Sequence, residues 1–287
     1  MSALPTFIVV GAMKAGTTSL YHYLGSHEQI YMPKVKELDF FVEEMNWPRG
    51  IAWYEQQFTG AGESAVALGE ASTAYTKYPR FQGVAERMAT VVPAVRLVYV
   101  VRDPVERIRS HYEHRVALGA ETAPAEVAAF ENPIYLDYSR YALQVEQFLR
   151  HFPPEQMLVI TSEGLRSDRR AVMHRVYEFL GVDPELIPAG LDTEYYRTDQ
   201  RRSYPPVVWS ARQLLKRRFP QAKRAKELVD SIRARRQPEP QAGASPTESR
   251  PDPLSPATRR RLEEVLAEDV ARLRPYLGPG FDGWGIA

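Results

Sequence analysis

The fold is decided by the stretch Phe7-Ile-Val-Val-Gly-Ala-Met-Lys-Ala-Gly-Thr-Thr-Ser-Leu20 near the start of the chain. It contains most of the apolar run 6–10, which is typical of a buried strand, and residues 17–24 then have helical spacing. The small residues between them expose backbone N–H groups at the positive end of the helix dipole. Such a turn binds anions, so we expect a phosphate-binding loop of the P-loop type. The alternative is a glycine-rich turn that only connects strand and helix.

The lysine of this loop does not stand where nucleoside triphosphatases have it. Their pattern GxxxxGK[ST] places lysine directly after the second glycine, but this chain has Thr17 there and carries Lys14 inside the loop. A triphosphatase also needs a strand-end Asp for magnesium, whereas the apolar run 96–101 is followed first by Arg102. An arginine at this strand end suits the binding of an anion better than that of a metal ion. The alternative is that Arg102 only forms an ion pair with a nearby acidic residue. The sequence therefore predicts anion binding at two strand ends.

Short apolar runs alternate with helical segments along the first 180 residues. The predicted strands are 6–10, 67–70, 96–101 and 156–160. The segments with helical spacing are 17–24, 80–89, 104–118, 138–151 and 167–180. This alternation predicts an α/β fold, a three-layer P-loop-type sandwich with a mostly parallel central sheet flanked by helices. Ligands of such folds bind outside the carboxyl ends of the strands.

We expect a single domain over residues 1–287. The strand pattern stops after Leu180, and the stretch 238–253, rich in Pro, Gln, Ser and Gly, is typical of a mobile loop. A last helix is predicted at about 255–277, with Ser255 as N-cap and Pro256 at its first position. Its apolar stripe consists of Leu262, Val265, Leu266, Val270, Leu273 and Leu277. This stripe predicts that the helix docks on the sheet domain.

The composition excludes several classes of protein. The 287 residues include no cysteine, which excludes a disulfide framework, a thiolate nucleophile and a Cys-ligated metal centre. No apolar run approaches the roughly 20 residues of a membrane-spanning helix, and no basic segment precedes the apolar stretch at the N-terminus. We therefore expect a cytoplasmic protein.

Three further motifs follow the first loop in order. They are Lys36-Glu-Leu-Asp-Phe-Phe41, Gly69-Glu-Ala-Ser-Thr-Ala-Tyr75 and Val101-Arg-Asp-Pro-Val-Glu-Arg-Ile-Arg-Ser-His-Tyr112. In this order and spacing the four motifs resemble the sulfotransferases that use 3'-phosphoadenosine 5'-phosphosulfate (PAPS), most of all the bacterial and heparan-sulfate-type branch. Residues 200–205 and the final helix that ends near Trp284 resemble C-terminal features of that branch, so the resemblance covers most of the chain.

The resemblance implies a set of cofactor-binding residues. The first loop would bind the 5'-phosphosulfate, and a second group would bind the 3'-phosphate, where an arginine fork and a hydroxyl donor suit a phosphate. A basic loop at 197–205 would close over the 3'-phosphate side. The loop residues are Lys14, Ala15, Gly16, Thr17, Thr18 and Ser19; those near the 3'-phosphate are Arg102, Ser110, Arg201, Arg202 and Tyr204. The product would be adenosine 3',5'-bisphosphate (PAP), and no metal is required.

The resemblance also implies the catalytic groups. Lys14 would stabilise the bridging oxygen of the leaving phosphate, and Glu37 matches the catalytic base of the heparan-type branch. Such a base takes the proton from the acceptor hydroxyl while the sulfuryl group is transferred in line. The alternatives are that Glu37 is only a solvated partner of Lys36, or that His111 or His114 is the base, since the cytosolic branch uses a histidine.

One position departs from the heparan-type pattern. A lysine follows the glutamate of the second motif in those enzymes, but this chain has Ala71. Lys34 or Lys36 is a candidate to supply the missing charge. A heparan acceptor is therefore doubtful, and the predicted acceptor is a hydroxyl of a carbohydrate, a glycolipid or a secondary metabolite.

The net charge of +1 hides a basic region at 201–237, which holds twelve Lys and Arg against two acids. It is interpreted as a helix with a solvated basic face, as part of an acceptor pocket, or as a contact with an anionic membrane surface. A nucleic-acid partner is not expected, and the sequence does not indicate the oligomeric state. Two other functions stay open: a P-loop kinase or triphosphatase, and a non-enzymatic protein that binds a nucleotide or polyanion.

Overall fold

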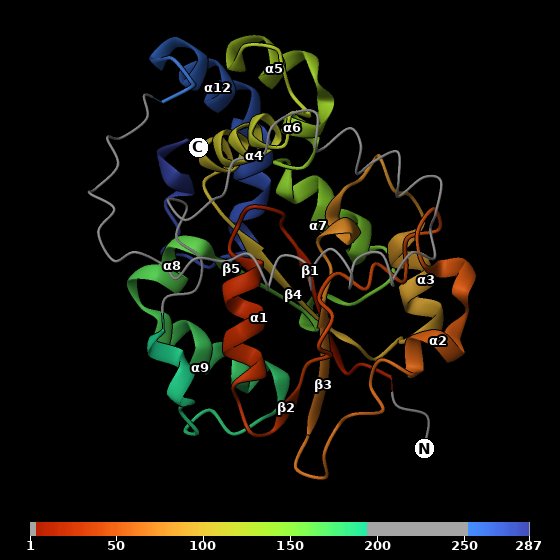
Figure 1. Ribbon diagram of the computed structural model, residues 1–287. Helices are drawn as coiled ribbons and strands as arrows, with labels where there is room; N and C mark the ends of the chain where they lie inside the picture. Colours follow the sequence, from red (N-terminus) through yellow and green to blue (C-terminus); the bar gives the residue numbers. More distant parts are fainter. Residues whose placement is uncertain (1–3, 194–251, 287) are drawn as a thin grey trace, which may run out of the picture.

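The computed structural model describes residues 4–193 and 252–286. Five parallel strands form one sheet in the order β2-β3-β1-β4-β5. Their bounds are β1 Phe7–Gly11, β2 Ile30–Tyr31, β3 Ala67–Ala71, β4 Arg96–Val101 and β5 Met157–Thr161. The predicted α/β fold class, with a mostly parallel sheet flanked by helices, is confirmed (Figure 1).

Helices follow the strands as the alternating pattern predicts. The α-helices of the described residues are α1 Thr17–Gly25, α2 Ile51–Glu55, α3 Val84–Val91, α4 Pro104–Ala117, α5 Ala125–Glu131, α6 Pro133–Asp137, α7 Tyr141–Leu149, α8 Ser162–Ser167, α9 Arg169–Leu180 and α12 Pro256–Leu273. The short 3-10 helix η2 Thr73–Thr76 follows β3 and contributes to the site described below. None of the helices in 4–193 and 252–286 is long and apolar enough to cross a membrane.

Several helix boundaries differ from the sequence prediction, among them the start of α7 at Tyr141 and the end of α12 at Leu273, and two further cases show the cause. The segment predicted as 80–89 becomes helical only at Val84, after Gly83 in the left-handed conformation with φ 67°. The segment 167–180 is preceded by a separate short helix, α8, and α9 begins where the Asp168 side chain accepts a hydrogen bond from the N–H of Ala171. Caps and turn residues, rather than apolar spacing, set these boundaries.

The last helix packs on the sheet domain by both apolar and polar contacts. Four residues of its predicted stripe are fully buried: Leu262, Leu266, Val270 and Leu273. Val265, predicted on the same stripe, is instead 41% exposed. The Asp269 carboxylate accepts hydrogen bonds at 3.0 Å from the N–H groups of Ala142 and Leu143, so α12 caps the start of α7. Figure 1 shows α12 grouped with α4, α5 and α6 at one end of the molecule.

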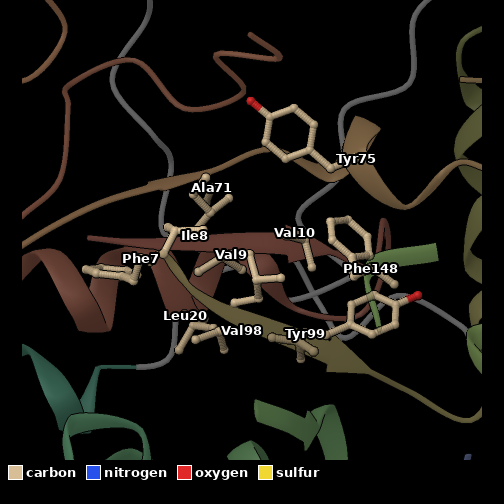
Figure 2. Packing of buried hydrophobic residues seen from close by; sticks show 14 of the residues in the cluster. Phe7, Ile8, Val9, Val10, Leu20, Ala71, Tyr75, Val98, Tyr99 and Phe148 are labelled. Atoms are coloured by element: carbon tan, nitrogen blue, oxygen red, sulfur yellow. The ribbon is translucent and has the colours of Figure 1, made fainter. Parts of the chain in front are cut away.

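The core is built around β1, which is buried along its whole length. Figure 2 shows its side chains packed against Leu20 of α1 and Val98 of β4. Gly69 of β3 leaves room for this packing, because a Cβ there would lie 2.0 Å from the ring of Phe7. Burial of β1 on both faces fixes its carboxyl end, and therefore the loop that follows it.

Candidate active site

The loop after β1 has the geometry of an anion-binding turn. Gly11 ends the strand where a Cβ would lie 2.0 Å from the Thr76 hydroxyl, so no side chain fits there. Lys14 and Gly16 adopt left-handed φ values of 73° and 97°, and α1 begins directly afterwards. Successive backbone N–H groups of such a turn line a concave surface for an anion.

The first turn of α1 holds the remaining predicted loop residues. Ala15 and Thr17 are buried, while Thr18 and Ser19 are half-buried. Among the described residues, no side chain caps this helix, and its first turn has no acidic residue that would neutralise the positive end of its dipole. The arrangement fits the predicted binding of a phosphosulfate.

Glu37 lies at the carboxyl end of the neighbouring strand β3. Its N–H donates to the carbonyl oxygen of Ala71 at 3.0 Å. Its Oε2 accepts from the N–H of Thr73 at 2.7 Å and from the Thr73 hydroxyl at 3.0 Å, and its Oε1 pairs with Lys36. The Lys36–Glu37 pair considered from the sequence therefore exists, but η2 also orients the carboxylate.

A buried hydrogen-bond network supports this region. Glu70 accepts hydrogen bonds from the hydroxyls of Tyr54 and Tyr75, each at 2.7 Å, and from Ser72 at 2.6 Å. Burial raises the pKa of Glu70 to about 7. Ser72 in turn accepts from the N–H of Asp39 at 2.9 Å. Burial, and then the negative charge of Glu37, raise the pKa of Asp39 to about 6.

Replacing Glu70 with glutamine should change how stability depends on pH. The pKa of Glu70 rises from 4.5 to about 7 on folding, so its stabilising contribution is complete below pH 4.5 and is lost as pH rises through 7. This group alone makes the free energy of unfolding fall by up to about 1.4 kcal/mol per pH unit in that window. Glutamine has no such titration. Urea unfolding of both proteins from pH 5 to 8 tests this, and parallel pH profiles would contradict it.

Arg102 and Ser110 were predicted to bind the 3'-phosphate, and the sheet topology brings the strand before Arg102 next to the loop. β4 pairs with β1, and the N–H of Ala12 donates to the carbonyl oxygen of Val100 at 2.6 Å, so the end of β4 and the loop share one edge of the sheet. Arg102 directly follows β4, and the buried Ser110 lies two turns along α4. The two predicted anion sites are thus adjacent.

Arg102 also makes the ion pair that the sequence left open as an alternative. Its Nη2 is 3.4 Å from Oε2 of Glu106. Glu106 binds Arg109 at 2.8 Å and Arg259 of α12 at 2.7 Å, and each of these two arginines has a second carboxylate partner. Arg102 therefore makes the weakest contact of the network, and exchanging it for a phosphate costs little.

Replacing Arg102 with alanine should weaken the binding of PAP about 10- to 100-fold, because a charge-assisted contact to the 3'-phosphate is lost. Calorimetric titration measures this directly. Arg170→Ala is a suitable control, since Arg170 is 61% exposed and pairs with Asp192. An unaltered dissociation constant in Arg102→Ala would refute its assignment to the 3'-phosphate.

The histidine alternatives lie on α4. His111 is buried against the rings of Tyr135 and Tyr138. Burial, and then the charge of Arg107, lower the pKa of His111 far below its ordinary value, which makes it a poor proton acceptor. His114 is half-buried one turn further on. Glu37 stays the favoured prediction for the base.

Some predicted residues lie outside the described part of the chain. These are Arg201, Arg202 and Tyr204, together with the basic region 201–237 and the predicted loop 238–253 except its last two residues, 252 and 253. Two described residues were not predicted to belong to the site: Asp39, and Lys77, which follows η2. Both act electrostatically on the region of Glu37.

An α/β fold with an anion-binding loop, a second basic strand end and a carboxylate beside them defines a class of group-transfer proteins. The family model for the sulfotransferase domain matches residues 4–204, and the chain belongs to the sulfotransferase family.

Proteins similar to this chain include sulfotransferases from human and mouse. The chain is 32% identical over 201 residues to human bifunctional heparan sulfate N-deacetylase/N-sulfotransferase 3, covering 63% of this chain and 23% of that protein. It is 31% identical over 250 residues to the mouse enzyme 4 of this name, covering 74% and 28%. The chain thus spans about a quarter of the length of these two relatives. Human heparan sulfate glucosamine 3-O-sulfotransferase 3B1 is 28% identical over 188 residues, covering 62% of this chain and 46% of that protein.

Among solved structures, a sulfotransferase from Alicyclobacillus acidocaldarius matches with a TM-score of 0.69 at 27% identity. The match covers 99% of both chains. The fold of this chain therefore agrees with its assignment to the sulfotransferase family.

Proposed function

We propose that this protein transfers the sulfuryl group of PAPS to a hydroxyl group of a carbohydrate. The observation that carries the proposal is the position of Lys14 and Glu37 at the carboxyl ends of the adjacent parallel strands β1 and β3. The N–H of Ser72 donates to the carbonyl oxygen of Val9 at 3.0 Å, which joins the two strand ends. A phosphate loop beside a fixed carboxylate is what transfer from an anionic donor to a hydroxyl requires.

The proposed reaction is an in-line displacement at sulfur. Glu37 takes the proton from the acceptor hydroxyl, the acceptor oxygen forms a bond to sulfur, and the bond between sulfur and the phosphate oxygen breaks. PAP leaves with the electron pair of that bond, and Lys14 stabilises the charge that develops on its oxygen. The products are a sulfate ester, PAP and the proton held by Glu37.

The donor is placed by two groups of residues. The turn from Lys14 to Ser19 is proposed to bind the 5'-phosphosulfate, and Arg102 with Ser110 the 3'-phosphate. Side chains and backbone N–H groups neutralise the negative charge of the donor. Arg201, Arg202 and Tyr204 stay predicted contacts of the 3'-phosphate side.

The acceptor class rests on the family relatives. The names of the three relatives above refer to heparan sulfate, a carbohydrate. Because this chain has Ala71 in place of the lysine of the heparan-type pattern, its acceptor is expected to differ from heparan sulfate. A glycolipid or secondary metabolite stays an alternative acceptor, and the cytoplasmic location stays a prediction.

A transfer assay tests the proposal. Sulfur-labelled PAPS is incubated with the protein and a panel of glucosamine-containing oligosaccharides that carry free hydroxyls or free amines. We expect label in the oligosaccharide and an equal amount of PAP, with no transfer from adenosine 5'-phosphosulfate, which lacks the 3'-phosphate. Label only on amines would show that the acceptor group is an amine and not a hydroxyl. Equal transfer from the donor without the 3'-phosphate would refute the assignment of PAPS as the donor.

A further inference from the structure

Lys77 belongs to none of the motifs that predicted the site, yet the structure holds it against the end of β1. The Thr76 hydroxyl donates to the carbonyl oxygen of Val10 at 3.0 Å, one residue before Gly11. On the other side, the N–H of Tyr78 donates to Oε1 of Gln144 at 2.9 Å, and Nε2 of Gln144 donates to the Tyr78 carbonyl oxygen at 2.8 Å. These bonds fix the backbone of Lys77 beside the phosphate loop.

Two carboxylates interact with the ammonium group of Lys77, those of Glu37 and Asp39. Thr73 binds Glu37 at the start of η2, and the N–H of Ala74 binds the carboxylate of Asp39. The buried Oδ1 of Asp39 has no hydrogen-bond partner among the described residues. The start of η2 therefore holds both carboxylates, and Lys77 follows its last residue.

The positive charge of Arg107 in α4 also acts on Lys77. Arg107 is fully buried, and it donates to the hydroxyl of Ser139 at 2.6 Å and to the carbonyl oxygen of Tyr135 at 2.9 Å. Both partners are neutral, and its Nη1 has no partner in the described part of the chain. A buried positive charge without an acidic partner is costly, and a bound anion relieves that cost.

The ring of His111 is close enough to both Lys77 and the phosphate loop to be affected by their charges. The positive charges of both Lys77 and Lys14 act on its ring, as does that of Arg107. Lys77 is therefore within electrostatic reach of the predicted base, Glu37, and shares a neighbour with the loop lysine. Burial lowers the pKa of Lys77, while Glu37 and Asp39 raise it, and an anionic donor also favours the charged form.

We propose that Lys77 is a further catalytic residue, whose ammonium group donates a hydrogen bond to a non-bridging oxygen of the sulfuryl group during transfer. This inference rests on the proposed function. The sulfuryl group passes from an oxygen near Lys14 to an acceptor near Glu37, and the charge on its remaining oxygens needs a donor between the two. Lys77 then supplies, from the end of η2, the charge that Ala71 does not provide.

The test compares Lys77→Met with Lys77→Arg and with Arg80→Met. Arg80 is an exposed cation three residues further on, so it serves as the matched control. Three quantities are measured for each protein: the rate of PAP release from PAPS with glucosamine oligosaccharides or water as acceptor, the dissociation constant of PAP, and the melting temperature without ligand.

Lys77→Met is expected to lower the rate of PAP release by about 100-fold or more, as the loss of a transition-state donor does. Its dissociation constant for PAP should stay within about threefold of the original, because PAP has no sulfuryl group. Lys77→Arg should recover part of the rate, and Arg80→Met should behave like the unmodified protein.

Two results would overturn the inference: an unchanged rate in Lys77→Met, or a loss of PAP affinity or melting temperature that parallels the loss of rate. The second result would make Lys77 a structural or phosphate-site residue. If the unmodified protein neither binds PAP nor releases it from PAPS, the proposed function fails, and this inference fails with it. An active protein that is insensitive to Lys77→Met refutes this inference alone.

Discussion

Replacing Glu37 with glutamine is expected to lower kcat by about 10²- to 10⁴-fold, the range that general-base catalysis contributes. The amide oxygen of glutamine can still accept from the N–H of Thr73, which binds Glu37 at 2.7 Å, so the side chain keeps its position. It cannot take a proton from the acceptor hydroxyl. The dissociation constant of PAP should change little, because Glu37 is proposed to act on the acceptor hydroxyl and not to bind the phosphates.

Initial rates of PAP release at saturating PAPS test this prediction. Glu43→Gln is the control, since Glu43 is a nearby carboxylate that is 70% exposed and paired with Arg87. If Glu37→Gln keeps its activity, the base lies elsewhere, and His111→Gln and His114→Gln become the next variants to measure.

Replacing Lys14 with methionine should lower kcat by about 100-fold or more, because the departing phosphate oxygen loses its positive neighbour. Methionine has a similar length and is also a non-glycine residue. The strain of the left-handed φ of 73° at this position is therefore nearly the same in both proteins. The difference between them is mainly the charge.

The same kinetic assay and the melting temperature distinguish the possible outcomes for Lys14. An unchanged melting temperature with a much lower kcat supports a role in the transition state, and Lys14→Arg should retain more activity than Lys14→Met. Turnover of Lys14→Met close to that of the unmodified protein would refute the assignment of Lys14 to the leaving group.

The first strand, its loop and the helix after it could be predicted from sequence with small errors. The strand predicted at 6–10 lies at Phe7–Gly11, and the helix predicted at 17–24 lies at Thr17–Gly25. The strand at 96–101 agrees with β4. The two strands are almost continuously apolar, and the helix follows Gly16 and ends at Gly25, so local signals and tertiary packing favour the same structure.

Other features depend on contacts that a sequence pattern does not contain. β2 has only two residues, too few for a periodic signal, and it exists because Ile30 and Tyr31 pair with Ala67 and Leu68. Val265 has the spacing of the buried stripe of α12 yet is exposed, because the stripe is narrower than the spacing suggests.

Among the site residues, too, some could be predicted from the sequence and others depend on tertiary contacts. Lys14, Glu37 and Arg102 follow strand ends or belong to compact motifs, so their types and spacing pointed to them. Lys77 follows a short 3-10 helix outside every motif, and its position depends on the hydrogen bond between Thr76 and Val10, which are 66 residues apart. A contact of this range is visible only in the folded chain.

We propose that the two anion sites together bind a 3'-phosphorylated adenine nucleotide. The most direct measurement is the melting temperature without magnesium in the presence of PAP, 5'-AMP or ATP. At about 100 times its dissociation constant, a ligand adds about 2.7 kcal/mol, which raises the melting temperature by several degrees. We predict such a rise for PAP and a much smaller one for 5'-AMP and ATP. A rise with magnesium and ATP but none with PAP would contradict the account and favour a P-loop kinase or triphosphatase.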